Sequence, residues 1–276
     1  MPRIAVLQMT SGIDPEANTR AIIDAAVEAA NAEADMLFTP EMSILLDKDR
    51  KRASQWINSG GPERVVDELR DWGFFASLQI SVGSMPVALA NGKMANRTFH
   101  FDEATGEPVI YDKIHMFDVE LDSGETWKES SAYEPGNQVV CVEDTPLGRL
   151  GLTICYDLRF PALFEELGRR ECNAIAVPAA FTVPTGKAHW HVMLRARAIE
   201  ASAFVIAAAQ VGKHEDGRET YGHSLVVDPW GEVLLDMGGE APGLGFCDID
   251  LGRIAEVRAQ VPSLANRRPI ATSPAQ

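Results

Sequence analysis

The fold class can be read from residues 148–178, which run GRLGLTICYDLRFPALFEELGRRECNAIAVP. The apolar run from Gly148 to Cys155 predicts a buried strand, Ala162 to Arg170 predicts a helix, and Asn173 to Pro178 predicts a second apolar strand. Two strands joined by a helix form a βαβ unit, and its strands are parallel because the crossover returns the chain to the same end of the sheet. These residues therefore predict an α/β protein.

The chain begins with the same order of elements. Arg3 to Met9 is a short apolar run, and Asp35 to Pro40 is another. Between them, Asp14-Pro15-Glu16 is typical of a helix start, since Asp caps free N–H groups and proline fits the first turn. A second βαβ unit is therefore expected within the first 40 residues.

The rest of the chain alternates short strands with helices. Helices are expected around Val65 to Trp72 and Ala188 to Ile199, and turns at residues 104–106 and 228–231. Strands are expected at Leu78–Met85, Ala95–Asp102, Pro108–Ile114, Phe204–Gln210, Ser224–Val227, Val233–Asp236 and Leu244–Ile249. No linker interrupts this order, so one domain over residues 1–276 is expected. The polar tail from about residue 267 to 276 is expected to pack loosely or against another subunit.

The composition limits the classes of partner. The chain has 276 residues, 46% of them hydrophobic and 24% charged, and a formal net charge of −15 at pH 7. Because a negative surface repels phosphate backbones and anionic lipid, neither nucleic acid nor a membrane is expected as a partner. The start MPRIAVLQM has no cationic stretch followed by a long apolar one, which predicts a cytoplasmic protein.

Cys155 is the strongest candidate nucleophile among the four cysteines. It ends a predicted strand where the chain turns into a helix, and the first N–H groups of a helix lower the pKa of a thiol and bind an oxyanion. Cys141, Cys172 and Cys247 have no such position, and no C-x-x-C pair suggests a zinc site or a disulfide framework. A buried, purely structural Cys155 is the alternative.

A cysteine nucleophile needs a base or a nearby cation. The histidines offer no recognisable partner, and His189 and His191 cannot face the same way on a helix, so no metal site is expected. Glu41 follows one predicted strand and Lys113 ends another. Because reactive groups at the carboxyl ends of strands meet at one edge of an α/β sheet, Glu41, Lys113 and Cys155 are expected to converge.

Three passages resemble the nitrilase superfamily of carbon-nitrogen hydrolases and follow its order over nearly the whole chain. They are Phe38-Thr-Pro-Glu41, Tyr111-Asp-Lys113-Ile-His-Met-Phe-Asp118 and Gly151 to Pro161. The resemblance implies a four-layer α-β-β-α sandwich, a Glu41-Lys113-Cys155 triad supported by Glu129, and a homodimer or larger homo-oligomer. The implied chemistry cleaves a small-molecule amide through a Cys155 thioester, with Lys113 and the Tyr156 backbone N–H on the oxyanion. It needs no metal and no organic cofactor.

Within the superfamily, four segments look most like the deaminated glutathione amidases; the ω-amidases are similar but less so around Ala207 to Gln210. The four segments are Thr185–Trp190, Leu194–Glu200, Ala207–Gln210 and Tyr221–Gly231.

Three further residues are candidates for substrate binding. Arg159 lies four residues after Cys155, on the same face of a helix, and could hold a substrate carboxylate; a surface or intersubunit salt bridge is the alternative. Phe181 and Thr185 resemble positions that line the acyl pocket, and core packing is an equal alternative for Phe181. Together they suit an α-keto acid with a distal amide, such as deaminated glutathione or α-ketoglutaramate. An ω-amidase acting on α-ketoglutaramate, a carbamoylase, a nitrilase and a catalytically silent interaction partner stay open as alternatives.

Overall fold

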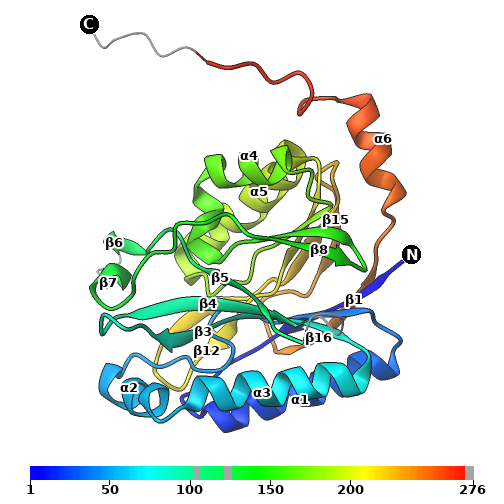
Figure 1. Cartoon of the computed structure of the whole chain (residues 1–276). Coiled ribbons are helices and arrows are strands. Elements are labelled where there is room, and N and C mark those ends of the chain that lie inside the picture. Colours follow the sequence, from blue (N-terminus) through cyan, green and yellow to red (C-terminus); the bar gives the residue numbers. More distant parts are fainter. Residues whose placement is uncertain (102–105, 121–125, 271–276) are drawn as a thin grey trace, which may run out of the picture.

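The computed structural model describes residues 1–101, 106–120 and 126–270, which form two six-stranded sheets and the helices around them (Figure 1). The first sheet contains β1 (Arg3–Gln8), β2 (Met36–Phe38), β3 (Gln79–Ala88), β4 (Met94–Phe101), β5 (Val109–Asp112) and β16 (Gly243–Asp248). The second contains β8 (Cys141–Thr145), β9 (Gly148–Leu152), β10 (Ala174–Ala176), β11 (Phe204–Ala207), β14 (Leu225–Val227) and β15 (Val233–Asp236). Their orders are β16-β1-β2-β3-β4-β5 and β15-β14-β11-β10-β9-β8.

Helices cover the outer face of each sheet (Figure 1). The α-helices are α1 (Pro15–Asn31), α2 (Arg50–Asn58), α3 (Gly61–Ala76), α4 (Pro161–Arg169), α5 (Val183–Ala201) and α6 (Gly252–Gln260). Because α1 and α3 pack on the first sheet and α4 and α5 on the second, the predicted four-layer α-β-β-α sandwich is confirmed. In the described residues, no helix is both long and apolar enough to span a bilayer.

Both predicted βαβ units are present. β1 and β2 are parallel neighbours joined through α1, and β9 and β10 are parallel neighbours joined through α4. The side chain of Asp14 caps α1 by accepting from the N–H groups of Glu16 and Ala17, as its position before Pro15 predicts. The central strands of each half therefore run in one direction, and their carboxyl ends meet at one edge of their sheet.

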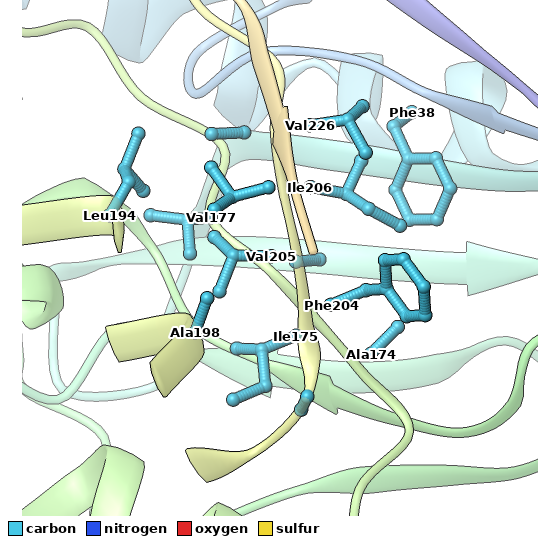
Figure 2. Packing of buried hydrophobic residues seen from close by; sticks show 14 of the residues in the cluster. Phe38, Ala174, Ile175, Val177, Leu194, Ala198, Phe204, Val205, Ile206 and Val226 are labelled. Carbon is cyan, nitrogen blue, oxygen red and sulfur yellow. The ribbon is translucent and has the colours of Figure 1, made fainter. Parts of the chain in front are cut away.

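Strands covered on both faces explain the nearly continuous apolar runs. In β1, Ile4 and Val6 belong to the core between the two sheets, whereas Ala5 and Leu7 belong to the core under the helices. Figure 2 shows the same alternation in β11, where Phe204 and Ile206 lie on the side of Phe38 from the first sheet and Val205 points toward α5. Residues from both halves of the chain thus fill the space between the sheets.

The helix predicted around Ala188 to Ile199 is confirmed as α5, but its stripe of apolar residues does not face the sheet. Val192 is 62% exposed and Ile199 is 49% exposed, whereas Trp190 and Leu194 are fully buried. The predicted stripe and the spacing of Trp190 and Leu194 both fit the period of a helix. Burying the larger Trp190 and Leu194 side chains removes more apolar surface from water. The pattern therefore identified the helix and missed its packed face.

Several short elements have no counterpart in the sequence prediction. These are α2, α6, β8, and the antiparallel pairs of β6 (Asp118–Glu120) with β7 (Thr126–Lys128) and of β12 (Val211–Lys213) with β13 (Glu219–Tyr221). The turn at residues 228–231 connects β14 to β15 as predicted. β4 and β5 pair as the predicted hairpin, but residues 104 and 105 of its turn lie outside the described residues.

The described part of the tail, residues 267–270, lies at the end of a segment that leads away from the two sheets after α6 (Figure 1). Residues 267–270 are exposed, and Arg267 donates a hydrogen bond to the Glu165 carbonyl oxygen at 2.8 Å. Residues 271–276 lie outside the described residues, so loose or intersubunit packing of the tail stays a prediction.

Candidate active site

The three residues expected to converge do so, each from just beyond the end of a strand. Glu41 follows β2, Lys113 follows β5, and Cys155 begins the 3-10 helix η2 (Cys155–Arg159) after β9. β5 runs in the same direction as β2 and β3, because two successive antiparallel pairings separate it from β3. All three side chains line one cavity of about 300 Å³, and the two sheets thus bring distant parts of the chain together.

The Lys113 ammonium lies between two carboxylates. Its Nζ donates to Glu41 Oε1 at 2.9 Å and to Glu129 Oε2 at 2.9 Å, and the Lys113 side chain is only 2% exposed. Burial by itself would lower the pKa of the lysine, but Glu129 and Glu41 together raise it well above its usual value. Lys113 is therefore a permanent cation inside the cavity.

The backbone around Glu41 is packed too tightly to move freely. A Cβ at Gly83 of β3 would lie 2.1 Å from the Thr39 carbonyl oxygen and 2.5 Å from Cβ of Pro178, so only glycine fits there. Oε2 of Glu41 accepts a hydrogen bond from the backbone N–H of Ala180 at 3.0 Å. The residue is 5% exposed, and its carboxylate is fixed from both sheets with one oxygen toward Lys113.

Asn96 is part of this cluster and is absent from the sequence prediction. Its side-chain Nδ2 donates to Glu41 Oε1 at 3.0 Å and to Glu129 Oε1 at 3.2 Å, and the residue is fully buried. One feature of the sequence indicates Asn96: it is an amide side chain within the otherwise apolar start of β4. Because a buried polar group needs a hydrogen-bond partner, such a residue is expected to contact another polar group. Glu129 is also held by the Phe117 N–H, which donates to Oε2 at 2.6 Å.

Cys155 has an unusual backbone conformation. Its φ of 47° lies in the left-handed region, which a residue other than glycine adopts at a cost, and its N–H donates to the Pro178 carbonyl oxygen at 2.8 Å. This bond ties the start of η2 to the strand end that also carries Ala180. The strand-to-helix corner that the sequence predicted is therefore a 3-10 turn, and α4 begins only at Pro161.

The expected lowering of the Cys155 pKa is wrong. Burial raises the pKa of the thiol well above its ordinary value, and the hydrogen-bonded Glu41 carboxylate raises it further, while Lys113 opposes them. The N–H groups of a short 3-10 turn do not outweigh this desolvation. Cys155 is consequently a neutral thiol beside a carboxylate that can accept its proton.

Asp157 connects the Cys155 segment to the Lys113 segment. The carboxylate is fully buried and accepts from Tyr111 Oη at 2.6 Å, from the Ile154 N–H at 2.9 Å and from the His115 N–H at 3.0 Å. His115 Nδ1 lies 2.7 Å from the same carboxylate. Ile154 precedes Cys155, and Tyr111 and His115 flank Lys113, so one side chain fixes the position of both reactive residues.

The predicted substrate-binding residues Arg159, Phe181 and Thr185 also line the cavity. The guanidinium carbon of Arg159 lies 5.4 Å from the centre of the Phe181 ring and 5.8 Å from that of Tyr156. Thr185, on the first turn of α5, exchanges a 2.8 Å hydrogen bond with Thr182. Arg159 was predicted to share a face with Cys155 because four residues separate them in an α-helix. That reason is wrong, since η2 is a 3-10 helix with three residues per turn, but Arg159 still lines the cavity.

The charge of the cavity differs from that of the whole chain. Arg159 pairs with no carboxylate among the residues that the structure describes; its nearest polar partner is His189 Nδ1 at 3.3 Å. Six lining residues are basic and four are acidic, despite the net charge of −15. The basic ones are Lys48, Arg50, Lys113, Lys128, Arg159 and Arg218. An anionic small molecule is therefore compatible with this cavity.

Residues that could hold a metal lie elsewhere. Within the described ranges, His191, His223 and Asp236 are the group whose ligand atoms converge, and none of them lines the cavity. His189 and His191 diverge on α5, as their spacing predicts: His189 contacts Arg159 and His191 contacts Asp236.

The sandwich of two sheets and the buried cysteine, glutamate and lysine define the class of protein that the nitrilase resemblance implies. The family model described as carbon-nitrogen hydrolase matches residues 3–259. The chain therefore belongs to the carbon-nitrogen hydrolase family, in the nitrilase superfamily.

Similar proteins narrow this class to amidases. The chain is 38% identical over 271 residues to the deaminated glutathione amidase of Yersinia enterocolitica, covering 96% of this chain and 92% of that one. The bovine (Bos taurus) deaminated glutathione amidase is 35% identical, with 98% of this chain and 83% of that one covered.

Solved structures show the same fold. The C. elegans NitFhit protein superimposes with a TM-score of 0.89 at 34% identity; the match covers 97% of this chain and 65%, less than two thirds, of that longer protein. A variant of the amidase from Nesterenkonia sp. AN1 has a TM-score of 0.77 at 26% identity, over 95% of this chain and 98% of that one. In that variant, acrylamide has added to the active-site cysteine.

Proposed function

We propose that this chain hydrolyses a linear amide of an α-keto acid, with deaminated glutathione as the preferred substrate, through a thioester on Cys155. The observation that carries the proposal is the buried cluster itself: a neutral thiol, a carboxylate and an ammonium line one cavity, with Lys113 Nζ 2.9 Å from Glu41. The similarity to deaminated glutathione amidases supports the choice of substrate.

In the first half of the reaction, Glu41 is the general base and Cys155 the nucleophile. As Sγ bonds to the amide carbonyl carbon, the thiol proton passes to the Glu41 carboxylate. The carbonyl oxygen becomes an oxyanion, which the Lys113 ammonium and the Tyr156 N–H in the first turn of η2 stabilise. Glu41 then gives the proton to the amide nitrogen, the C–N bond breaks, and the amine leaves.

In the second half, water hydrolyses the thioester. Glu41 removes a proton from the water as its oxygen bonds to the acyl carbon, and the same oxyanion groups act again. The C–S bond then breaks, and Glu41 returns the proton to the sulfur of Cys155. Glu129 is a positioning residue in this scheme, since its carboxylate holds Lys113 at 2.9 Å.

Arg159 is the proposed anchor for a substrate carboxylate. Its guanidinium lies between two aromatic rings and pairs with no carboxylate in the described part of the chain, so its charge is available inside the cavity. Phe181 and Thr185 line the same region and are proposed to contact the acyl chain. An α-keto acid offers a carboxylate for Arg159 and a distal amide for Cys155.

The remaining properties of the chain are proposed on the same basis. Residues 1–276 form one carbon-nitrogen hydrolase domain that needs no metal or organic cofactor for this reaction. The exposed Val192 and Ile199 on α5 support a homo-oligomer, which sedimentation of the purified chain would measure. A cytoplasmic location is proposed as well, and the net charge of −15 supports the absence of nucleic-acid and anionic-membrane partners.

The test compares two substrates with one purified enzyme. Deaminated glutathione releases cysteinylglycine and α-ketoglutaramate releases ammonia, so each product is measured separately. We expect a higher kcat/KM for deaminated glutathione and no turnover of either by Cys155→Ala. A higher value for α-ketoglutaramate would make the enzyme an ω-amidase instead. If Cys155 hydrolysed neither compound, the natural substrate would contain another class of C–N bond.

A further inference from the structure

A second cluster of chemically competent side chains lies outside the catalytic cavity. It joins three elements: His191 is on α5, His223 is in the loop between β13 and β14, and Asp236 is the last residue of β15. Two imidazoles and a carboxylate form a donor set that suits zinc and other first-row transition ions. The proposed hydrolysis uses none of these three residues.

The ligand atoms are already close together. His191 Nε2 lies 3.0 Å from Asp236 Oδ2, and His223 Nδ1 lies 2.9 Å from Asp236 Oδ1. All the candidate ligand atoms lie within 4.8 Å of one another. With bonds of about 2.0–2.1 Å, a tetrahedral ion holds its ligand atoms roughly 3.3 Å apart, so side-chain shifts of a few tenths of an ångström to about 1.5 Å suffice.

The surrounding structure fixes His223 and Asp236 independently of any ion. His223 has a left-handed φ of 55°; its N–H donates to the Gly238 carbonyl oxygen at 2.8 Å, and its own carbonyl accepts from Trp190 Nε1 at 2.8 Å. The His223 ring stacks on Tyr221 with centroids 4.5 Å apart. Asp236 Oδ1 also accepts from the Gly238 N–H at 2.9 Å. The Gly238 bond orients the Asp236 carboxylate, as hydrogen bonds to ligating carboxylates do in metal sites.

We propose that His191, His223 and Asp236 bind one divalent first-row transition-metal ion, with solvent completing the coordination. The side chains are 36%, 24% and 34% exposed, so an ion can enter from water. Each imidazole offers the lone pair of the nitrogen that now faces Asp236, and the proton on that nitrogen moves through solvent to the other ring nitrogen. The bound ion links α5 to the end of β15.

Cobalt is the probe that separates this site from the thiol of the catalytic cavity. Co²⁺ is added to the whole purified chain, and its visible absorption is recorded as a function of concentration. We expect saturation at one ion per chain, a spectrum without sulfur-to-cobalt charge transfer, and the same spectrum from Cys155→Ala. Zn²⁺ should displace the cobalt and raise the melting temperature of the chain.

Ligand variants decide the location. His191→Ala and Asp236→Asn should each weaken Co²⁺ binding by at least about tenfold, because each removes one of three protein ligands. His189→Ala is the matched control: it removes an imidazole from the same helix and should leave the Co²⁺ affinity unchanged. Circular dichroism confirms that each variant is folded.

Two results would overturn the proposal. One is a chain that shows no saturable cobalt absorption, or only a sulfur-bound form that disappears in Cys155→Ala. The other is wild-type Co²⁺ affinity in both folded ligand variants. Neither result bears on amide hydrolysis, which is measured separately by product release.

Discussion

Replacing Asp157 with Asn should impair both folding stability and turnover, although this residue contacts no substrate. Asn has nearly the same shape as Asp, so the substitution changes charge and hydrogen bonding without opening a cavity. In the wild-type chain, Asp157 Oδ2 accepts from Tyr111 Oη and the Ile154 N–H, and Oδ1 accepts from the His115 N–H and faces His115 Nδ1. Asp157→Asn puts an NH₂ group in place of one of these oxygens.

The size of the effect follows from the number of donors that lose an acceptor. If the NH₂ replaces Oδ2, the Tyr111 hydroxyl can turn to accept from it, but the Ile154 N–H faces a donor. If it replaces Oδ1, His115 Nδ1 can become an acceptor, but the His115 N–H faces a donor. Each hydrogen bond to a charged group contributes about 1.5–3 kcal/mol. With one of these bonds lost at a fully buried site and the others no longer made to a charged group, we expect the free energy of unfolding to fall by about 3 kcal/mol.

Turnover should fall because Asp157 aligns Cys155 with Lys113. Ile154 precedes Cys155, and Tyr111 and His115 lie two residues on either side of Lys113, so loosening these bonds separates the nucleophile from its cation. Misplacement by about 1 Å can cost roughly 100-fold in rate, and we expect kcat to fall about 10- to 100-fold with a smaller change in KM.

Urea unfolding followed by circular dichroism measures stability, and product release at saturating substrate measures kcat. Tyr111→Phe is the matched control, since it removes one donor but keeps the buried carboxylate and its other partners; its loss of stability should be roughly half as large. If Asp157→Asn changed the unfolding free energy by less than about 0.5 kcal/mol and left kcat intact, the inferred alignment would be wrong.

Three further predictions concern the catalytic cavity. Cys155→Ala should abolish product release while circular dichroism and the melting temperature stay near those of the wild type, and wild-type turnover would exclude the thioester. Arg159→Met should raise KM for keto-acid amides about 10- to 100-fold but for neutral amides only slightly, because a charge-assisted pair contributes about 1.5–3 kcal/mol; equal effects in steady-state kinetics would place the carboxylate elsewhere. Because burial and Glu41 raise the Cys155 pKa well above its ordinary value, the thiol stays protonated as pH rises through about 8.5, so kcat/KM measured from pH 7 to 9 should show no rise there. A tenfold increase centred near pH 8.5 would instead indicate a free thiolate as the reactive form.

The candidate site was found largely through short passages at the ends of apolar runs. Glu41, Lys113 and Cys155 each follow a strand. The structure brings them to one cavity because the ends of β2 and β5 in the first sheet face the same space as the end of β9 in the second. Asn96 and Asp157 escaped prediction because a polar residue has no visible partner in the sequence. Their partners, Glu129 for Asn96 and Tyr111 for Asp157, lie 33 and 46 residues away along the chain.

The sequence by itself determined the local elements and their chemistry. Apolar runs specified strands buried on both faces, Asp14-Pro15 specified a helix start, and the passage around Cys155 specified a turn at the end of a strand. These features depend on neighbours within a few residues, and the side chains there are sufficient to specify them.

Only the tertiary structure decided how those residues behave. It buried Trp190 in place of Val192, and it raised the pKa of Cys155 where the local turn alone would have lowered it. It also placed His191 beside Asp236, 45 residues further along the chain. Burial and electrostatic interaction depend on every group that surrounds a side chain in space, and most of those groups come from distant parts of the sequence.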